Sequence, residues 1–222
     1  MIYIPIGMQC TNMYFLEKHN KRSYTFPFSW MFSTPKFVFE MLELLLDKNI
    51  NIKELVVFYF FHCTKTATNE DENFIISKDD GYILYNDKYN VIFPHEIDFG
   101  QDMNKEKFNN ILEKYIRRFQ RLKDFILNSE EDICFIYTSQ SSLESGNFKV
   151  NGINAINDSY YYLTKIYELI AKYKNKFKFI VFDAIKEEDK SKLNTNIILI
   201  ELNSCNNYRE LLPQMDNYVN YL

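Results

Sequence analysis

Short apolar segments of strand length alternate along this chain with segments that repeat apolar residues at helical spacing, and this alternation constrains the fold most. The expected strands are Ile2–Ile6, Leu55–Phe61, Ile133–Tyr137, Phe177–Phe182 and Ile197–Leu202. The expected helices are residues 11–19, 34–47, 104–128 and 157–175, with a short helix at the C-terminus. Strands and helices in alternation predict an α/β layered fold.

A hairpin interrupts this alternation in the middle of the chain. Residues 82–85 and 89–93 flank the polar turn Asn86-Asp87-Lys88, which is typical of two antiparallel strands. We therefore predict a mixed β-sheet flanked by helices. Residues 64–80 are polar and predict a surface loop. With no internal repeat and no linker, residues 1–222 are expected to form a single domain.

Composition and charge exclude several classes of protein. The net charge of −4 speaks against a sequence-independent nucleic-acid binder, which needs Lys and Arg to release phosphate counterions. The longest apolar run, Leu55–Phe61, is too short to cross a bilayer, and no signal peptide follows Met1. We expect a cytoplasmic protein without a membrane partner. The cysteines form no zinc-ligand spacing and glycine-rich phosphate motifs are missing, so neither a metal nor a cofactor is predicted.

Cys10 stands where the first strand ends and the first helix begins. A helix N-terminus has free backbone N–H groups and the positive end of the helix dipole, both of which favour a thiolate. The N–H groups of Cys10 and Gln9 could also bind an oxyanion. The alternative is a buried structural thiol, which is common for free cysteine. We expect Cys63 and Cys134 to lie in the core, while the sequence does not assign Cys205 to either role.

A cysteine nucleophile needs a base, which is usually histidine. His19 lies in a charged string and is expected to be exposed, and His62 ends the apolar run beside Cys63. His95 directly follows a strand and has Glu96 and Asp98 close by, so a carboxylate could fix its tautomer. His95 is therefore the preferred base, although a loop histidine bonded to backbone has the same sequence context.

Five motifs in order resemble the putative papain-like cysteine peptidases, over about residues 2–138. That family has a Leu-Gly-x-x-Cys element after its first strand, a Pro-Phe-Asp-Trp block, a strand that ends in His-Asp-Phe, an arginine-rich helix and a further apolar strand. The corresponding segments here are Ile6–Cys10, Pro27–Trp30, His95–Phe99, Arg117–Arg121 and Ile133–Tyr137. The resemblance implies catalysis by Cys10 and His95.

The chain departs from the family pattern at two places. Ser29 replaces the aspartate of the tryptophan block, so any acid role there is lost. The His-Asp pair is stretched, and we favour Asp98 over Glu96 to orient His95 because Phe99 then keeps the Asp-Phe pair. The further candidates for substrate binding are Gln9, Trp30, Glu96 and Arg118; core packing for Trp30 and a solvated helix face for Arg118 remain alternatives.

Three functional hypotheses follow. The first is a thiol hydrolase or acyltransferase that acts on an amide, ester or thioester, with Cys10, His95 and Asp98 as nucleophile, base and orienting acid. Its substrate would be a small molecule, a peptide or a glycan precursor. The second is a non-catalytic α/β binding module, favoured by Ser29 and the stretched histidine motif. The third is a glycan-related transferase that does not use the thiol.

Overall fold

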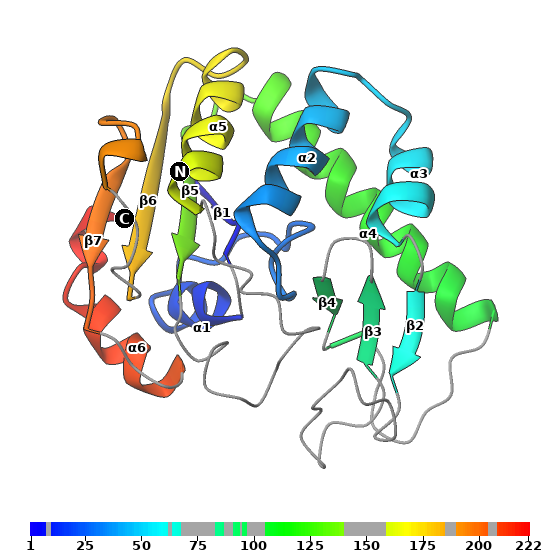
Figure 1. The fold of residues 1–222 in the computed structure, drawn as a ribbon, viewed down its shortest axis with the longest axis horizontal. Helices are drawn as coiled ribbons and strands as arrows, with labels where there is room; N and C mark the ends of the chain where they lie inside the picture. Colours follow the sequence, from blue (N-terminus) through cyan, green and yellow to red (C-terminus); the bar gives the residue numbers. More distant parts are fainter. Residues whose placement is uncertain are drawn as a thin grey trace.

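The computed structural model describes residues 1–7, 10–61, 64–67, 83–86, 91–93, 95–96, 105–139, 159–184, 190–203 and 208–222. In chain order its elements are β1 (Ile2–Pro5), α1 (Thr11–Lys18), α2 (Pro35–Leu46), α3 (Ile52–Glu54), η1 (Leu55–Phe60), β2 (Thr64–Ala67), β3 (Ile83–Asn86), β4 (Val91–Phe93), α4 (Lys105–Leu127), β5 (Ile133–Thr138), α5 (Ser159–Ala171), β6 (Phe177–Asp183), η3 (Lys190–Lys192), β7 (Ile198–Glu201), α6 (Tyr208–Asp216) and η4 (Val219–Tyr221). Figure 1 shows their arrangement.

The central sheet has four parallel strands in the order β1-β5-β6-β7. All six residues of β5 are buried, as expected for an inner strand of a parallel sheet with helices on both faces. The α/β fold predicted from the alternation is thereby confirmed, with each strand of this sheet within two residues of its expected bounds.

The predicted hairpin is also present, because β3 and β4 pair in antiparallel fashion. It does not join the parallel sheet, however. With β2 it forms a separate three-stranded antiparallel sheet, which lies on the other side of α2 in Figure 1. β2 occupies residues that we expected in a surface loop. Its sequence, Thr-Lys-Thr-Ala, has no apolar run to mark a strand, since its ladder depends on a partner further along the chain.

The prediction of a strand at Leu55–Phe61 is wrong, because Leu55–Phe60 forms a π-helix. The Asn51 side chain accepts hydrogen bonds from the N–H groups of Lys53 and Glu54 and starts the helical segment. The N–H of Phe61 then donates to Val56, five residues back. An unbroken apolar run does not distinguish a buried strand from a buried helix. Here the Asn51 cap just before the run favours the helix.

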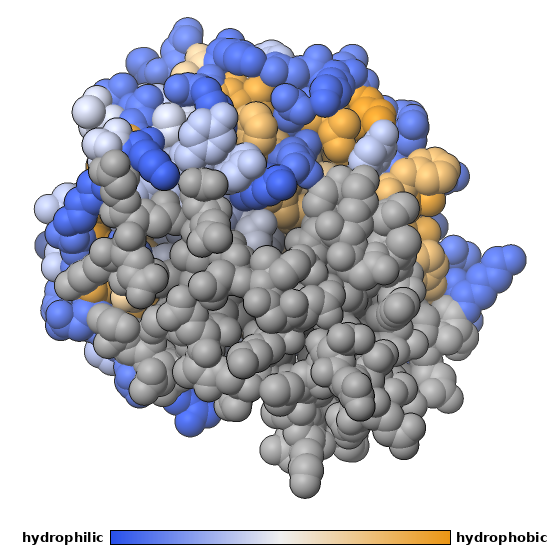
Figure 2. Space-filling model, viewed as in Figure 1, coloured by the Kyte–Doolittle hydropathy of each residue, from blue (hydrophilic) through white to orange (hydrophobic). Residues whose placement is uncertain are grey.

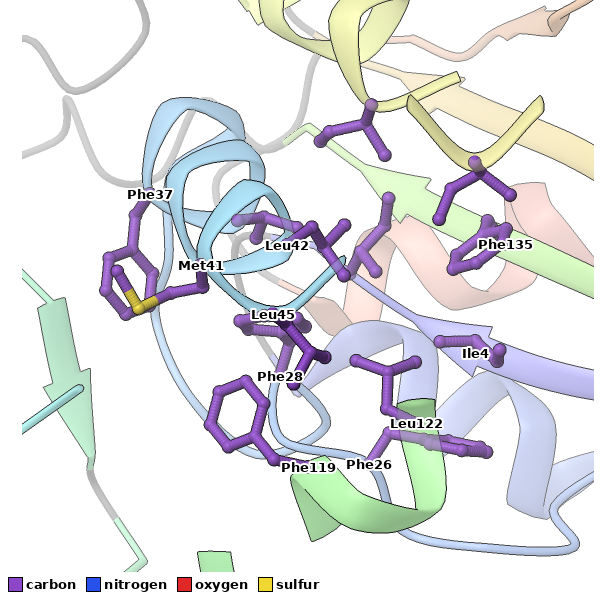
Figure 3. Close-up of a cluster of buried hydrophobic side chains, with 14 of the residues drawn as sticks. Ile4, Phe26, Phe28, Phe37, Met41, Leu42, Leu45, Phe119, Leu122 and Phe135 are labelled. Carbon is purple, nitrogen blue, oxygen red and sulfur yellow. The ribbon is translucent and has the colours of Figure 1, made fainter. Parts of the chain in front are cut away.

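Two hydrophobic clusters cover the two faces of the parallel sheet. One joins alternate residues of β1, β5 and β6 to α2, α4, α5 and η1. The other joins the opposite face of the same strands to α1 and α6. Figure 3 shows part of the first cluster, in which Phe37 comes from α2 and Phe119 from α4, while Ile4 and Phe135 come from the sheet. The helix that follows β1, α1, thus lies on one face of the parallel sheet, and the helix that follows β5, α5, lies on the other.

Most of the described surface in Figure 2 is hydrophilic, and a hydrophobic patch lies over the α3–η1 segment at the right. Phe58 of η1 contributes to the exposed apolar surface, with 63% of its area accessible. In the part of the chain that the structure describes, every helix is too short or too polar to span a membrane.

The Asp216 carboxylate of the C-terminal helix α6 links this helix to α1. Asp216 pairs with Lys18 and accepts a hydrogen bond from His19 at 2.7 Å, so His19 is held at this contact rather than free in solvent as expected. Partial burial alone would raise the pKa of Asp216, but the hydrogen bonds from Lys18 and His19 outweigh it and hold the pKa below the ordinary value.

Replacing Asp216 by asparagine is therefore expected to lower the free energy of unfolding at neutral pH. A carboxyl with a lowered folded-state pKa stabilises the fold above its unfolded-state pKa of about 3.9, and this contribution is lost as the pH falls through the folded-state pKa. Urea unfolding at pH 7 and pH 3 checks this. The wild type and Asp216→Asn should differ at pH 7 and converge at the lower pH, and a constant difference would contradict the assignment.

Candidate active site

The loop after β1 is built on a buried polar network that brings Cys10 to the start of α1. Asn12 donates to the carbonyl of Ile136 at 3.3 Å and accepts from the hydroxyl of Thr138, so the first turn of α1 is tied to β5. Ser33 donates to the carbonyl of Gly7 at 3.3 Å. These contacts fix the cysteine beside the carboxyl end of the parallel sheet.

Gly7 has no room for a side chain in this network. A Cβ at this position would overlap the side-chain nitrogen of Asn12 and lie 3.0 Å from the backbone nitrogen of Thr138. We expect Gly7→Ala to lower the free energy of unfolding by about 1–3 kcal/mol, the usual cost of overpacking. Urea unfolding measures the loss. Because the backbone of β5 cannot yield as a side chain can, Asn12→Ala in the same chain should restore only part of it. A Gly7→Ala protein as stable as the wild type would contradict this.

The structure brings Cys10 and His95 together across 85 positions of sequence. The Sγ atom of Cys10 lies 3.1 Å from Nε2 of His95. Cys10 is buried, with 8% of its area exposed, whereas His95 is exposed. A thiol at this distance can donate a hydrogen bond to Nε2 when the neutral imidazole carries its proton on Nδ1.

Trp30 packs beside the thiol–imidazole pair. Its ring meets the His95 ring edge to face, with the centroids 5.6 Å apart, and Tyr14 meets Trp30 in the same way. The Arg22 guanidinium lies over the Trp30 ring at 5.5 Å. Trp30 is half-buried, so it is both a packing residue and a neighbour of the imidazole. Its ring restricts how the imidazole can turn.

Ser29, which departs from the family pattern, has a local role. It is fully buried, and its hydroxyl accepts a hydrogen bond from the N–H of Phe26 at 2.8 Å. The backbone N–H of Ser29 donates to the Phe26 carbonyl. This position closes a turn, a task that the short oxygen-bearing side chains of serine and aspartate share.

Burial raises the pKa of the Cys10 thiol to about 12, and the backbone N–H of Cys10 only partly opposes this. The sequence had predicted a lowered pKa from the helix N-terminus. That expectation is wrong for the protein without substrate, because the loss of water around the sulfur outweighs the helix end. Cys10 is therefore a neutral thiol at rest. Its proton would have to pass to His95 during a reaction.

Glu96 faces α4. Its side chain is 2% exposed and pairs with the Lys114 ammonium. The Tyr115 hydroxyl donates to its Oε1 at 2.7 Å, and the Arg118 guanidinium lies 3.8 Å from the same oxygen. Arg118, 14% exposed, also lies over the Tyr115 ring, but its Nη1 makes no hydrogen bond to the described residues.

Several predicted residues lie outside the part of the chain that the structure describes: Gln9, His62, Cys63, Asp98 and Cys205. The roles proposed for Gln9 and Asp98 stay predictions. Cys134 is buried in β5, as expected for a core cysteine. Within the described ranges, no group of three His, Cys, Asp or Glu side chains is arranged to hold a metal ion.

Asn12 and Tyr115 are the site residues that sequence reasoning missed. Tyr115 lies among the apolar residues that repeat at helical spacing in α4, and this pattern alone assigns it to the core. A buried tyrosine needs a hydrogen-bond partner for its hydroxyl, which is a signal in itself. The identity of that partner, 19 positions upstream, depends on how β4 meets α4 and is not written in the local sequence.

The fold places this pair at a favourable point of the sheet. β1 and β5 are neighbours, and the helices that follow them, α1 and α5, cover opposite faces. Ligands of open α/β sheets bind outside the carboxyl ends of the strands. Cys10 stands five residues beyond the end of β1, at this point.

Comparison with known proteins agrees with the geometry. The family model described as putative papain-like cysteine peptidase matches residues 1–205. No curated protein and no solved structure matches the chain. The family match extends well beyond the segment in which the motifs were recognised and includes both Cys10 and His95. The chain therefore belongs to the putative papain-like cysteine peptidase family.

Proposed function

We propose that the protein is a thiol hydrolase or acyltransferase in which Cys10 is the nucleophile and His95 the general base. The observation that carries this proposal is the 3.1 Å distance between Sγ of Cys10 and Nε2 of His95, beside the carboxyl end of a parallel sheet. The family name supports thiol chemistry in the same general terms.

The proposed first step acylates the cysteine. The Cys10 sulfur attacks the carbonyl carbon of an amide, ester or thioester while its proton moves to Nε2 of His95. The backbone N–H of Cys10 faces its own sulfur and stands close to where the oxyanion develops. The tetrahedral intermediate then expels the amine, alcohol or thiol, which takes the proton from His95, and leaves an acyl group on Cys10.

The second step releases the acyl group. Water or an amine attacks the thioester carbonyl and gives its proton to His95, the Cys10 sulfur leaves as a thiolate, and His95 returns the proton to it. The two outcomes are hydrolysis and transfer. Asp98 is proposed to hold the imidazole in the tautomer that has its proton on Nδ1.

Intact-mass analysis after incubation with a small acyl thioester tests the proposal. We expect one added acyl group, located on Cys10 by peptide mapping and released by hydroxylamine. Cys134→Ala is the matched control, since burial also raises the pKa of Cys134 to about 12 and yet it lies in the core. Acylation should persist in Cys134→Ala and vanish in Cys10→Ala. An adduct that survives in Cys10→Ala would sink the proposal.

A binding module without turnover is the second candidate, and one observation favours it. Cys10 is nearly covered and its pKa is raised, as in a structural thiol. On this reading the thiol–imidazole contact only stabilises the loop after β1. The same acylation experiment separates the two, because a structural thiol would stay unmodified while the protein is folded.

A further inference from the structure

The His95 turn is fixed from both sides. Two residues before His95, Phe93 is fully buried at the end of β4. One residue after it, the Glu96 carboxylate is buried against α4. His95 itself is exposed, and the Trp30 ring packs on its imidazole. Phe93 and Glu96 hold the backbone on either side of His95, from which the imidazole reaches Cys10.

A single side chain of α4 contacts both Phe93 and Glu96. The Tyr115 ring meets the Phe93 ring with the centroids 5.8 Å apart, and its hydroxyl donates to Oε1 of Glu96 at 2.7 Å. Tyr115 is fully buried, and Phe61 and the Arg118 guanidinium pack on its ring at 5.2 and 4.8 Å. A residue held this firmly can act as a fixed reference for the turn.

We infer that Tyr115 is a positioning residue for His95: it bridges Phe93 and Glu96 and thereby sets the distance between the imidazole and Cys10. This inference rests on the proposed function, in which that distance governs reactivity. Burial, and next the negative charge of Glu96, raise the pKa of Tyr115 well above its ordinary value. The hydroxyl therefore stays a donor over the whole pH range in which the protein would work.

Tyr115→Phe removes one half of the bridge and keeps the other. The phenyl ring still packs on Phe93, but Glu96 loses its hydroxyl donor. We expect the rate of Cys10 alkylation by iodoacetamide at pH 7.5 to fall about tenfold, since an error of about 1 Å in the position of a catalytic group costs up to 10²-fold. The rate is measured by mass spectrometry of the Cys10 peptide. Tyr173→Phe removes a tyrosine–carboxylate hydrogen bond at Asp47, away from the site, and should react like the wild type.

A double-mutant cycle separates positioning from general loosening of the fold. If Tyr115 acts through His95, Tyr115→Phe should change nothing further in a His95→Ala background. An equal loss in both backgrounds, or an unchanged rate in Tyr115→Phe alone, would overturn the inference. If His95→Ala itself reacts at the wild-type rate, the proposed function fails, and that outcome is distinct because it does not depend on Tyr115.

Glu96 variants test the same bridge and leave the aromatic ring of Tyr115 in place. Glu96→Gln keeps an oxygen that can accept from Tyr115, and we expect its alkylation rate to stay within about threefold of the wild type. Glu96→Ala removes the acceptor and should match Tyr115→Phe. Equal rates in Glu96→Gln and Glu96→Ala would show that the hydroxyl contact does not position His95. The comparison of Glu96→Gln with Glu96→Ala tests the positioning role of Tyr115 even if Tyr115→Phe fails to fold.

Discussion

His95→Ala is expected to slow the acylation of Cys10 by a thioester by on the order of 10²- to 10⁴-fold, the usual contribution of a general base. The effect should be this large because burial raises the pKa of Cys10 to about 12, so few molecules carry a free thiolate at neutral pH. Without the imidazole at 3.1 Å, the thiol proton has no nearby acceptor among the described side chains. The rate of acyl-enzyme formation, followed by intact mass at pH 7.5, measures the loss.

His19→Ala is the matched control, because it removes a histidine that contacts Asp216 at the far end of α1. It should acylate at the wild-type rate. An His95→Ala protein as fast as the wild type would remove the base from the mechanism.

Phe60→Ala is expected to lower the free energy of unfolding by about 3–5 kcal/mol, the range for deleting a buried phenyl ring. Phe60 lies in the π-helix and is fully buried. Among the described residues, its ring contacts the aromatic rings of Phe28, Phe37, Phe61, Phe93, Tyr115 and Phe119. No small shift of these rings could refill the space of the phenyl ring. The loss of stability therefore includes the cost of the remaining cavity in addition to the lost transfer free energy of the ring.

Phe58→Ala provides the comparison within the same helix. Phe58 is 63% exposed, so its removal should change the free energy of unfolding by no more than about 0.5 kcal/mol. Urea unfolding of both variants measures the difference. In a strand, Phe58 and Phe60 would lie on the same face, so their different exposure fits the π-helix, as does the hydrogen bond from Phe61 to Val56. Similar losses for the two variants would contradict the packing described here.

The elements that carry their own signals could be read from the sequence. Thr34 and Pro35 mark the start of α2, where the Thr34 side chain accepts from the N–H of Phe37 as a cap does. The apolar stripe of α4 gave its bounds to within one residue. β1 and β5 are buried throughout and β6 over its last five residues, so each of these strands reads as an apolar run.

The predictions that failed depend on a helix cap, on a distant strand partner or on how the whole chain packs. η1 needed the Asn51 cap to distinguish a helix from a strand, and β2 needed β3 to form a ladder at all. The pairing of Cys10 with His95 was foreseen from helix start, strand end and family motifs. The raised pKa of Cys10 was not, because desolvation depends on what the whole chain packs around the sulfur.

The central claim is that His95 makes Cys10 a nucleophile, and the most direct measurement compares the two described cysteines. Burial raises the pKa of Cys10 and of Cys134 alike to about 12, but only Cys10 has an imidazole within hydrogen-bond reach among the described residues. Iodoacetamide should label Cys10 of the folded protein at pH 7.5 at least about tenfold faster than Cys134. Equal, slow labelling of both thiols until the protein unfolds would contradict the account.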